Sequence, residues 1–126
     1  MTRSRPSLEM LLWFSLLAGP LAFAVSHVVG VGATFATCSP AGSRWSVPMH
    51  GIQLGVAAGA ALVIVLAELA GIAAFIATRQ VDKEGEPPLA RIRFLSAAAL
   101  AIGPIFLTLV LLGGIGAAVH PACRKA

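Results

Sequence analysis

The sequence has little charge. Only 11% of its 126 residues are Asp, Glu, Lys or Arg, and 58% are hydrophobic. Soluble domains carry about 25% charged residues. The mean hydropathy of +0.91 is correspondingly high. Such a composition excludes an ordinary soluble domain.

The sequence also lacks the motifs of the common soluble chemistries. It contains no CxxC or zinc-ligand spacing, no phosphate-binding glycine loop and no GxSxG. The net charge of +4 comes from small basic groups between apolar runs, not from a basic stripe or patch. This pattern is typical of membrane orientation signals and predicts no nucleic-acid partner. The sequence shows no recognisable nucleophile–base pair or metal-ligand set, so we expect a protein that is not an enzyme.

Three apolar runs, at about 10–37, 51–78 and 94–119, exceed the roughly 20 residues that a membrane-spanning helix needs. They predict an all-α membrane protein with three transmembrane helices in one membrane domain, residues 1–126. Prolines and glycine break the connector 38–50. In the charged connector 79–93, Pro87 and Pro88 are expected to stop any helix.

Lys and Arg counts in the flanks predict the orientation. Six lie before the first run or between the second and third: Arg3, Arg5, Arg79, Lys83, Arg91 and Arg93. Three lie on the other side: Arg44, Arg124 and Lys125. We therefore expect a cytoplasmic N-terminus and 79–93 loop, with the 38–50 loop and C-terminus on the outer, periplasmic side. The alternative is a signal peptide cleaved near Ala22–Ala24, although the apolar run continues to Thr37.

Two cysteines, Cys38 and Cys123, close the first and third runs and fall on the same outer side. In an oxidising compartment we expect them to pair, which stabilises by ~4–5 kcal/mol at most in the chain-entropy model. Two unbonded thiols are the simpler alternative. A further alternative is copper handling, because Met49, His50 and His120 are expected at the same interface, although a disulfide would remove both thiolates.

The second run has two distinct faces. Glu68 is the only acidic residue deep within a span, and at 100° per residue it lies below His50 and within 60° of Gln53. Intramembrane carboxyls usually face protein or water, so Glu68 is either a proton-path residue or a carboxyl satisfied inside a complex. On another side, Gly51, Gly55 and Gly59 form a small-xxx-small row suited to helix packing.

His27 in the first run is too deep to share a haem with His50 or His120, so we expect it to form one interhelical hydrogen bond, with Ser26 or Glu68 as candidate partners. The first and third runs each carry Gly-Pro, at Gly19–Pro20 and Gly103–Pro104. The prolines deprive the carbonyls of Leu16 and Leu100 of their helical partners. Matched pairs of this kind shape a helix to fit a partner or mark a binding site.

The pattern resembles small three-span bacterial membrane proteins of uncharacterised activity, often encoded beside cytochrome c oxidase structural and assembly genes. The residues that carry the resemblance are Trp13, Gly19–Pro20, His27, the cysteine pair, Trp45 with His50, and Arg93-Phe94-Leu95. The chain departs from the pattern at Phe23, where tryptophan is expected, and at Gly103–Pro104. The resemblance implies a location in the bacterial inner (cytoplasmic) membrane and partners among the transmembrane subunits of a respiratory oxidase.

Two functions remain open. The first is a non-catalytic accessory subunit or assembly partner of a terminal oxidase, packing by its Gly/Ala-rich faces. Haem and copper would then belong to the partner complex, and this chain alone would bind no cofactor. The second is a homo-oligomeric channel or proton-coupled carrier in which Glu68 lines the path.

Overall fold

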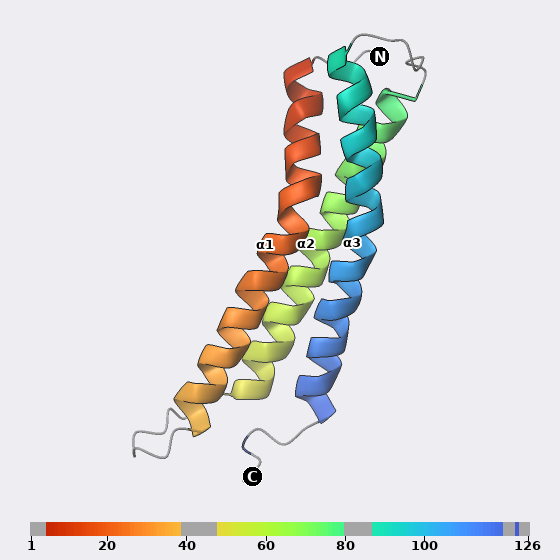
Figure 1. Ribbon diagram of the computed structural model, residues 1–126. Coiled ribbons are helices and arrows are strands. Elements are labelled where there is room, and N and C mark those ends of the chain that lie inside the picture. Colours follow the sequence, from red (N-terminus) through yellow and green to blue (C-terminus); the bar gives the residue numbers. More distant parts are fainter. Residues whose placement is uncertain (1–4, 39–47, 80–86, 120–122, 124–126) are drawn as a thin grey trace.

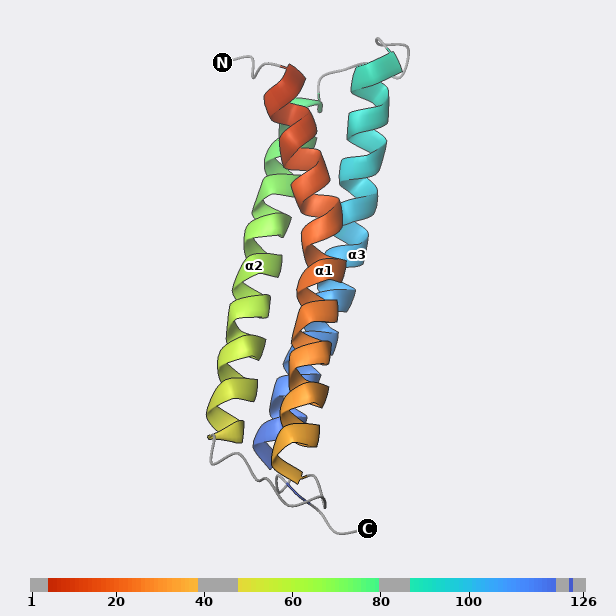
Figure 2. The ribbon, with the colours of Figure 1, turned by 90° about the vertical axis from the view of Figure 1, so that its left-hand side faces the viewer.

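The computed structural model describes residues 5–38, 48–79, 87–119 and 123. It contains three helices: α1 (Arg5–Cys38), α2 (Met49–Ala77) and α3 (Pro87–Val119). They run side by side along their whole length (Figures 1 and 2). The start of α1, the end of α2 and the start of α3 lie at one end of the bundle, and the three other helix termini lie at the opposite end (Figure 1). The predicted all-α class is confirmed.

Each helix is long enough to cross a bilayer with length to spare. The helices have 34, 29 and 33 residues, which at 1.5 Å per residue correspond to about 44–51 Å, against a hydrocarbon core of about 30 Å. All three qualify as membrane spans by length and hydropathy. The chain is therefore a multi-pass membrane protein.

One predicted boundary was wrong. Pro87 and Pro88 were expected to stop any helix, but α3 begins at Pro87. Proline is favoured at the first helical position because its missing N–H would have no intrahelical partner there, and its fixed φ already suits a helix. The two prolines therefore start α3. The helix extends seven residues before the expected start of the third span.

Two hydrophobic clusters hold the helices together. Near the end where α1 begins, Leu8 and Leu12 of α1 pack with Ile92 of α3. Further along the bundle, Ala60 and Ile64 of α2 pack with Val110 of α3. Partly buried apolar side chains of all three helices surround this second cluster, among them Ala22, Phe23 and Phe106.

Between these clusters a small residue brings the three helices into close contact. A β-carbon placed on Gly71 of α2 would lie 3.3 Å from both the Leu100 side chain of α3 and the Ser15 side chain of α1. Three polar side chains are also buried: Ser15, Thr78 and Ser96. Each hydroxyl donates to a carbonyl one turn back in its own helix, with O···O distances of 2.7–2.9 Å. Within residues 5–38, 48–79, 87–119 and 123, no buried side-chain oxygen or nitrogen is therefore left without a partner.

Much of the surface of the described helices is apolar. Large hydrophobic side chains on every helix are exposed, for example Phe35, Phe94 and Val119, each with 73% of its surface accessible. A soluble monomer does not carry apolar surface on this scale. We therefore expect this apolar surface to contact lipid tails.

Candidate functional site

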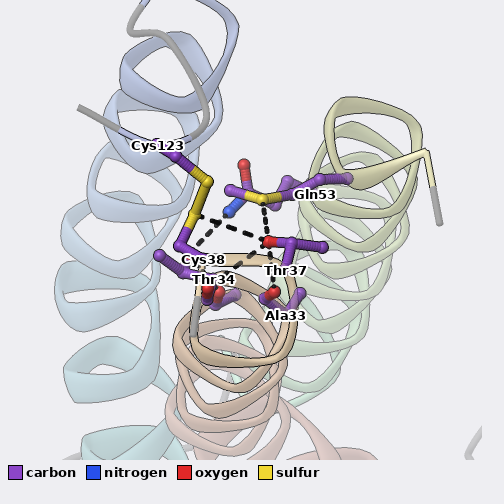
Figure 3. Close-up of a disulfide and its surroundings, with 8 residues drawn as sticks. Ala33, Thr34, Thr37, Cys38, Gln53 and Cys123 are labelled. Carbon is purple, nitrogen blue, oxygen red and sulfur yellow. Dashed lines mark hydrogen bonds between the residues drawn. A yellow bond between two sulfur atoms is a disulfide. The ribbon is translucent and has the colours of Figure 1, made fainter. Parts of the chain in front are cut away.

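A disulfide joins the ends of α1 and α3. Cys38, the last residue of α1, is bonded to Cys123, which follows α3, with 5.6 Å between the α-carbons. The predicted pairing is confirmed, and the alternative of two unbonded thiols is excluded. Figure 3 shows the bond beside the last turn of α1. Both cysteines therefore lie at the same end of the bundle.

Hydrogen bonds tie α1 to α2 beside the disulfide. The Thr37 hydroxyl lies 2.8 Å from the Met49 sulfur and 2.8 Å from the Ala33 carbonyl oxygen. One turn earlier, the Gln53 amide donates to the Thr34 hydroxyl at 3.3 Å, and Figure 3 shows Gln53 pointing at Thr34. Gln53 thus turns toward α1.

His50 ties α2 to α3 at the same end. Its ring Nδ1 lies 3.0 Å from the backbone carbonyl oxygen of Ala117. Since a carbonyl only accepts, Nδ1 carries the proton in this contact. The α1–α2 hydrogen bonds, the His50 contact and the disulfide therefore connect all three helices pairwise. This end of the bundle is cross-linked by polar and covalent contacts.

A groove of about 340 Å³ lies next to this cross-linked end. Both α1 and α3 line it, together with Gln53 and Ala57 of α2. Its polar lining comes from Ser26, His27, Thr34 and Gln53, and its glycines are Gly30, Gly113 and Gly114. The groove has room for a side chain or small ring from another molecule, with hydrogen-bonding groups on its walls.

His27 lies at the side of this groove. Its ring is exposed and stacks on Phe23 of the same helix, with 5.9 Å between the ring centroids. In the part of the chain that the structure describes, no hydrogen bond links His27 to Ser26 or Glu68, the two partners that the sequence suggested. The ring nitrogens are thus available to a group outside this chain.

Gly51, Gly55 and Gly59 lie on the outside of the bundle, and all three are exposed. A β-carbon on Gly55 or Gly59 would meet no atom within 4 Å, and one on Gly51 would meet only Pro48 of the same chain. Gly59 also lines a wide apolar groove of about 840 Å³ between α1 and α2. The glycine row is therefore not used to pack the helices of this chain together.

Glu68 points at α3. Its carboxyl group occupies the position that a β-carbon on Gly103 would take, and its Cγ lies 3.2 Å from that position. Only glycine leaves room for the carboxyl here. The other Gly-Pro pair also serves an internal contact, since Gly19 of α1 lies against the Phe106 ring of α3. Both helices continue through their prolines.

Several residues that were candidate copper ligands make other contacts in the structure. Both cysteine sulfurs are in the disulfide, the Met49 sulfur lies against the Thr37 hydroxyl, and the His50 Nδ1 faces Ala117. His120 lies outside the described residues, as do Trp45 and most of both connecting loops. Among residues 5–38, 48–79, 87–119 and 123, no group of three or more His, Cys, Asp or Glu could hold a metal.

Sequence reasoning missed the two threonines of the cross-linked end. Thr34 and Thr37 precede Cys38 by four residues and one residue, within the last turn or so of α1. Residues three and four apart are neighbours on a helix surface, so Thr34 lies beside both Thr37 and Cys38. Two hydroxyls beside a cysteine at the end of an apolar run could therefore have indicated a polar interhelical contact there.

Together these features define a three-span membrane protein with a cross-linked end, a groove with four polar lining residues beside it and an exposed glycine row. No protein-family model matches the chain, and no curated protein or solved structure matches it either.

Proposed function

We propose that this chain is a non-catalytic accessory subunit or assembly partner of a larger membrane complex, which packs its glycine row against a transmembrane helix of another subunit. The observation that carries the proposal is the open space above Gly55 and Gly59. Small residues in a membrane let two helix backbones approach closely, and such rows are typical of helix–helix interfaces.

The grooves support the same proposal. The α1–α2 groove, with Gly59 in its wall, is almost wholly apolar, and a transmembrane helix presents side chains of that character. The smaller groove offers His27 and Gln53, which are costly to leave in lipid and gain hydrogen bonds at a protein interface. Glu68, in contrast, is turned toward α3 of its own chain, which favours a subunit over a channel lined by this carboxyl.

The proposed partner is a respiratory terminal oxidase in the bacterial cytoplasmic membrane, with the 38–50 loop, the cysteines and the C-terminus on the periplasmic side. The sequence resemblance supports this choice of partner, and the Lys and Arg distribution supports the orientation. The oxidase would hold the haem and copper. This chain would contribute helix-packing surfaces.

The test is a pull-down of the tagged chain in mild detergent, followed by haem spectra and mass spectrometry. We expect haem and oxidase subunits to copurify with the wild type, and to be lost from Gly55→Leu/Gly59→Leu. Gly32→Leu/Gly116→Leu is the matched control, because a β-carbon on either glycine would meet no atom within 4 Å but the two glycines belong to the other two helices. A clean homo-oligomer without haem would refute the partner and favour transport through Glu68.

A further inference from the structure

The Glu68 side chain of α2 contacts α3 next to a proline. The Glu68 carboxyl lies over Gly103, and the next residue is Pro104. Because proline has no N–H, the carbonyl of Leu100, four residues earlier, loses its regular helical hydrogen bond. A carbonyl in lipid or in a packed bundle needs a donor, since one without a partner is costly.

The position of the carboxyl indicates how it reaches that carbonyl. In a helix the Cα–Cβ bond tilts toward the N-terminus, and a hydroxyl carried there regularly bonds the carbonyl three or four residues back. Ser15, Thr78 and Ser96 do this in the present structure. The Glu68 carboxyl takes the place of a β-carbon on Gly103, the position from which a side chain reaches back toward the carbonyl of Leu100, three residues earlier.

An ionised carboxylate cannot make this contact, because a carboxylate and a carbonyl are both acceptors. A protonated carboxyl carries one O–H donor. We propose that Glu68 is protonated and donates this O–H to the Leu100 carbonyl, so that the α2–α3 contact forms a proton-binding site at the Gly103–Pro104 step. The proposal does not depend on the identity of any partner complex.

Charged groups on the neighbouring elements are too far away to compensate an ionised Glu68. Among the described residues, Arg79 follows the end of α2, eleven residues after Glu68 and about 16 Å away by helical rise, and Arg93 is ten residues before Gly103 on α3, about 15 Å. On α1, His27 lines the groove with Ala57, which is eleven residues from Glu68, again about 16 Å. In the described part of the chain no ion pair or hydrogen bond joins Glu68 to another side chain. Protonation is therefore what neutralises the Glu68 carboxyl at this site.

Infrared spectroscopy of the purified chain in lipid, at neutral pH, tests the protonation. Glu68 is the only acidic residue within the apolar runs 10–37, 51–78 and 94–119, and a variant at this position assigns the band. We expect one protonated-carboxyl C=O band in the wild type that shifts in D₂O and is absent from Glu68→Gln. The absence of any such band from the wild type would overturn the proposal. Gly103→Ala, which displaces the carboxyl, should move the band to higher frequency because its hydrogen bond is lost.

A mutant cycle tests the acceptor. Glu68→Gln keeps an N–H donor at this position, and Glu68→Met has none. With Pro104 present, we expect Glu68→Met to reduce the folded-to-unfolded ratio roughly 3- to 15-fold relative to Glu68→Gln. In a Pro104→Ala background the N–H of residue 104 takes the Leu100 carbonyl, and the difference should fall below about twofold. An unchanged difference would overturn the assignment of Leu100. If Glu68→Met does not fold, the protonated-carboxyl C=O band of the Pro104→Ala variant is the test. A shift of this band supports Leu100 as the acceptor, and an unmoved band refutes it.

Discussion

Ser15 on α1 and Gly71 on α2 are in such close contact that a β-carbon added to Gly71 would lie 3.3 Å from the Ser15 β-carbon. Leu100 of α3 lies at the same distance from that position. The three helices therefore meet at one glycine. Its neighbours belong to two different helices, so a larger residue could not be accommodated by moving one side chain alone.

Gly71→Ala should lower the free energy of unfolding by about 1–3 kcal/mol, because it overpacks this contact. Gly55→Ala is the matched control on the same helix, since its β-carbon would enter open space, and it should raise the free energy of unfolding by about 0.5–1 kcal/mol through helix propensity. Both changes gain the same helix propensity, so the difference reports packing. Unfolding in mixed micelles would measure it. Equal effects at the two positions would contradict the packing described for Gly71.

Breaking the disulfide should destabilise the fold without changing its helix content. Cys38→Ser/Cys123→Ser is expected to cost up to ~4.5 kcal/mol, with the restraint of the membrane on the unfolded chain reducing this value. Cys38→Ser alone should cost nearly as much as the double change, because either one removes the whole bond. Thermal unfolding in detergent would measure both variants. Independent, additive losses would be inconsistent with a bond between these two residues.

The Gln53–Thr34 hydrogen bond should contribute a measurable coupling between α1 and α2. Gln53→Leu and Thr34→Val remove one partner each, and interhelical hydrogen bonds in membranes average about 0.6 kcal/mol in double-mutant cycles. We expect a coupling free energy of that size, from the unfolding of the two single variants and the double variant. A coupling of zero would mean that the 3.3 Å contact adds nothing to stability.

Orientation can be tested without altering the Lys and Arg distribution. In the Cys38→Ser/Cys123→Ser background, Val119→Cys should react with a membrane-impermeant maleimide in intact cells, because Val119 is exposed at the end of α3 beside Cys123. Glu9→Cys, exposed near the start of α1, should react only after permeabilisation. The reverse labelling would place the N-terminus outside, against the excess of six basic residues over three.

The helices and the disulfide could be predicted because membrane-spanning segments are recognisable in the sequence. Long apolar runs have few alternatives to a helix, and three crossings place Cys38 and Cys123 on the same side. Neither the inward packing of Gly71 nor the outward placement of Gly55 could be predicted. A membrane helix is apolar all round, so hydrophobic periodicity does not mark the face that packs. Small residues occur on several faces of α2, and only the assembled neighbours decide which of them meet another helix.

Helical geometry gave a partial prediction of the polar groups. At 100° per residue His50 and Glu68 share a direction, and both face α3 in the structure. Gln53 lies 60° from Glu68 on that scale, and it faces α1. A three-helix bundle offers each helix two neighbours, so a modest angular offset along α2 is enough to change the partner helix.

The Cys38–Cys123 bond closes a covalent ring that contains all of α2 and α3 and leaves α1 outside. Cys123 follows α3 in the chain, so it reaches Cys38 only after the third helix has crossed the membrane. A chain in which α3 fails to cross would keep its two thiols on opposite sides of the membrane, where they cannot bond to each other. The thiol state of each molecule thus records whether its insertion was completed, and a cell could separate finished from unfinished copies by that difference alone.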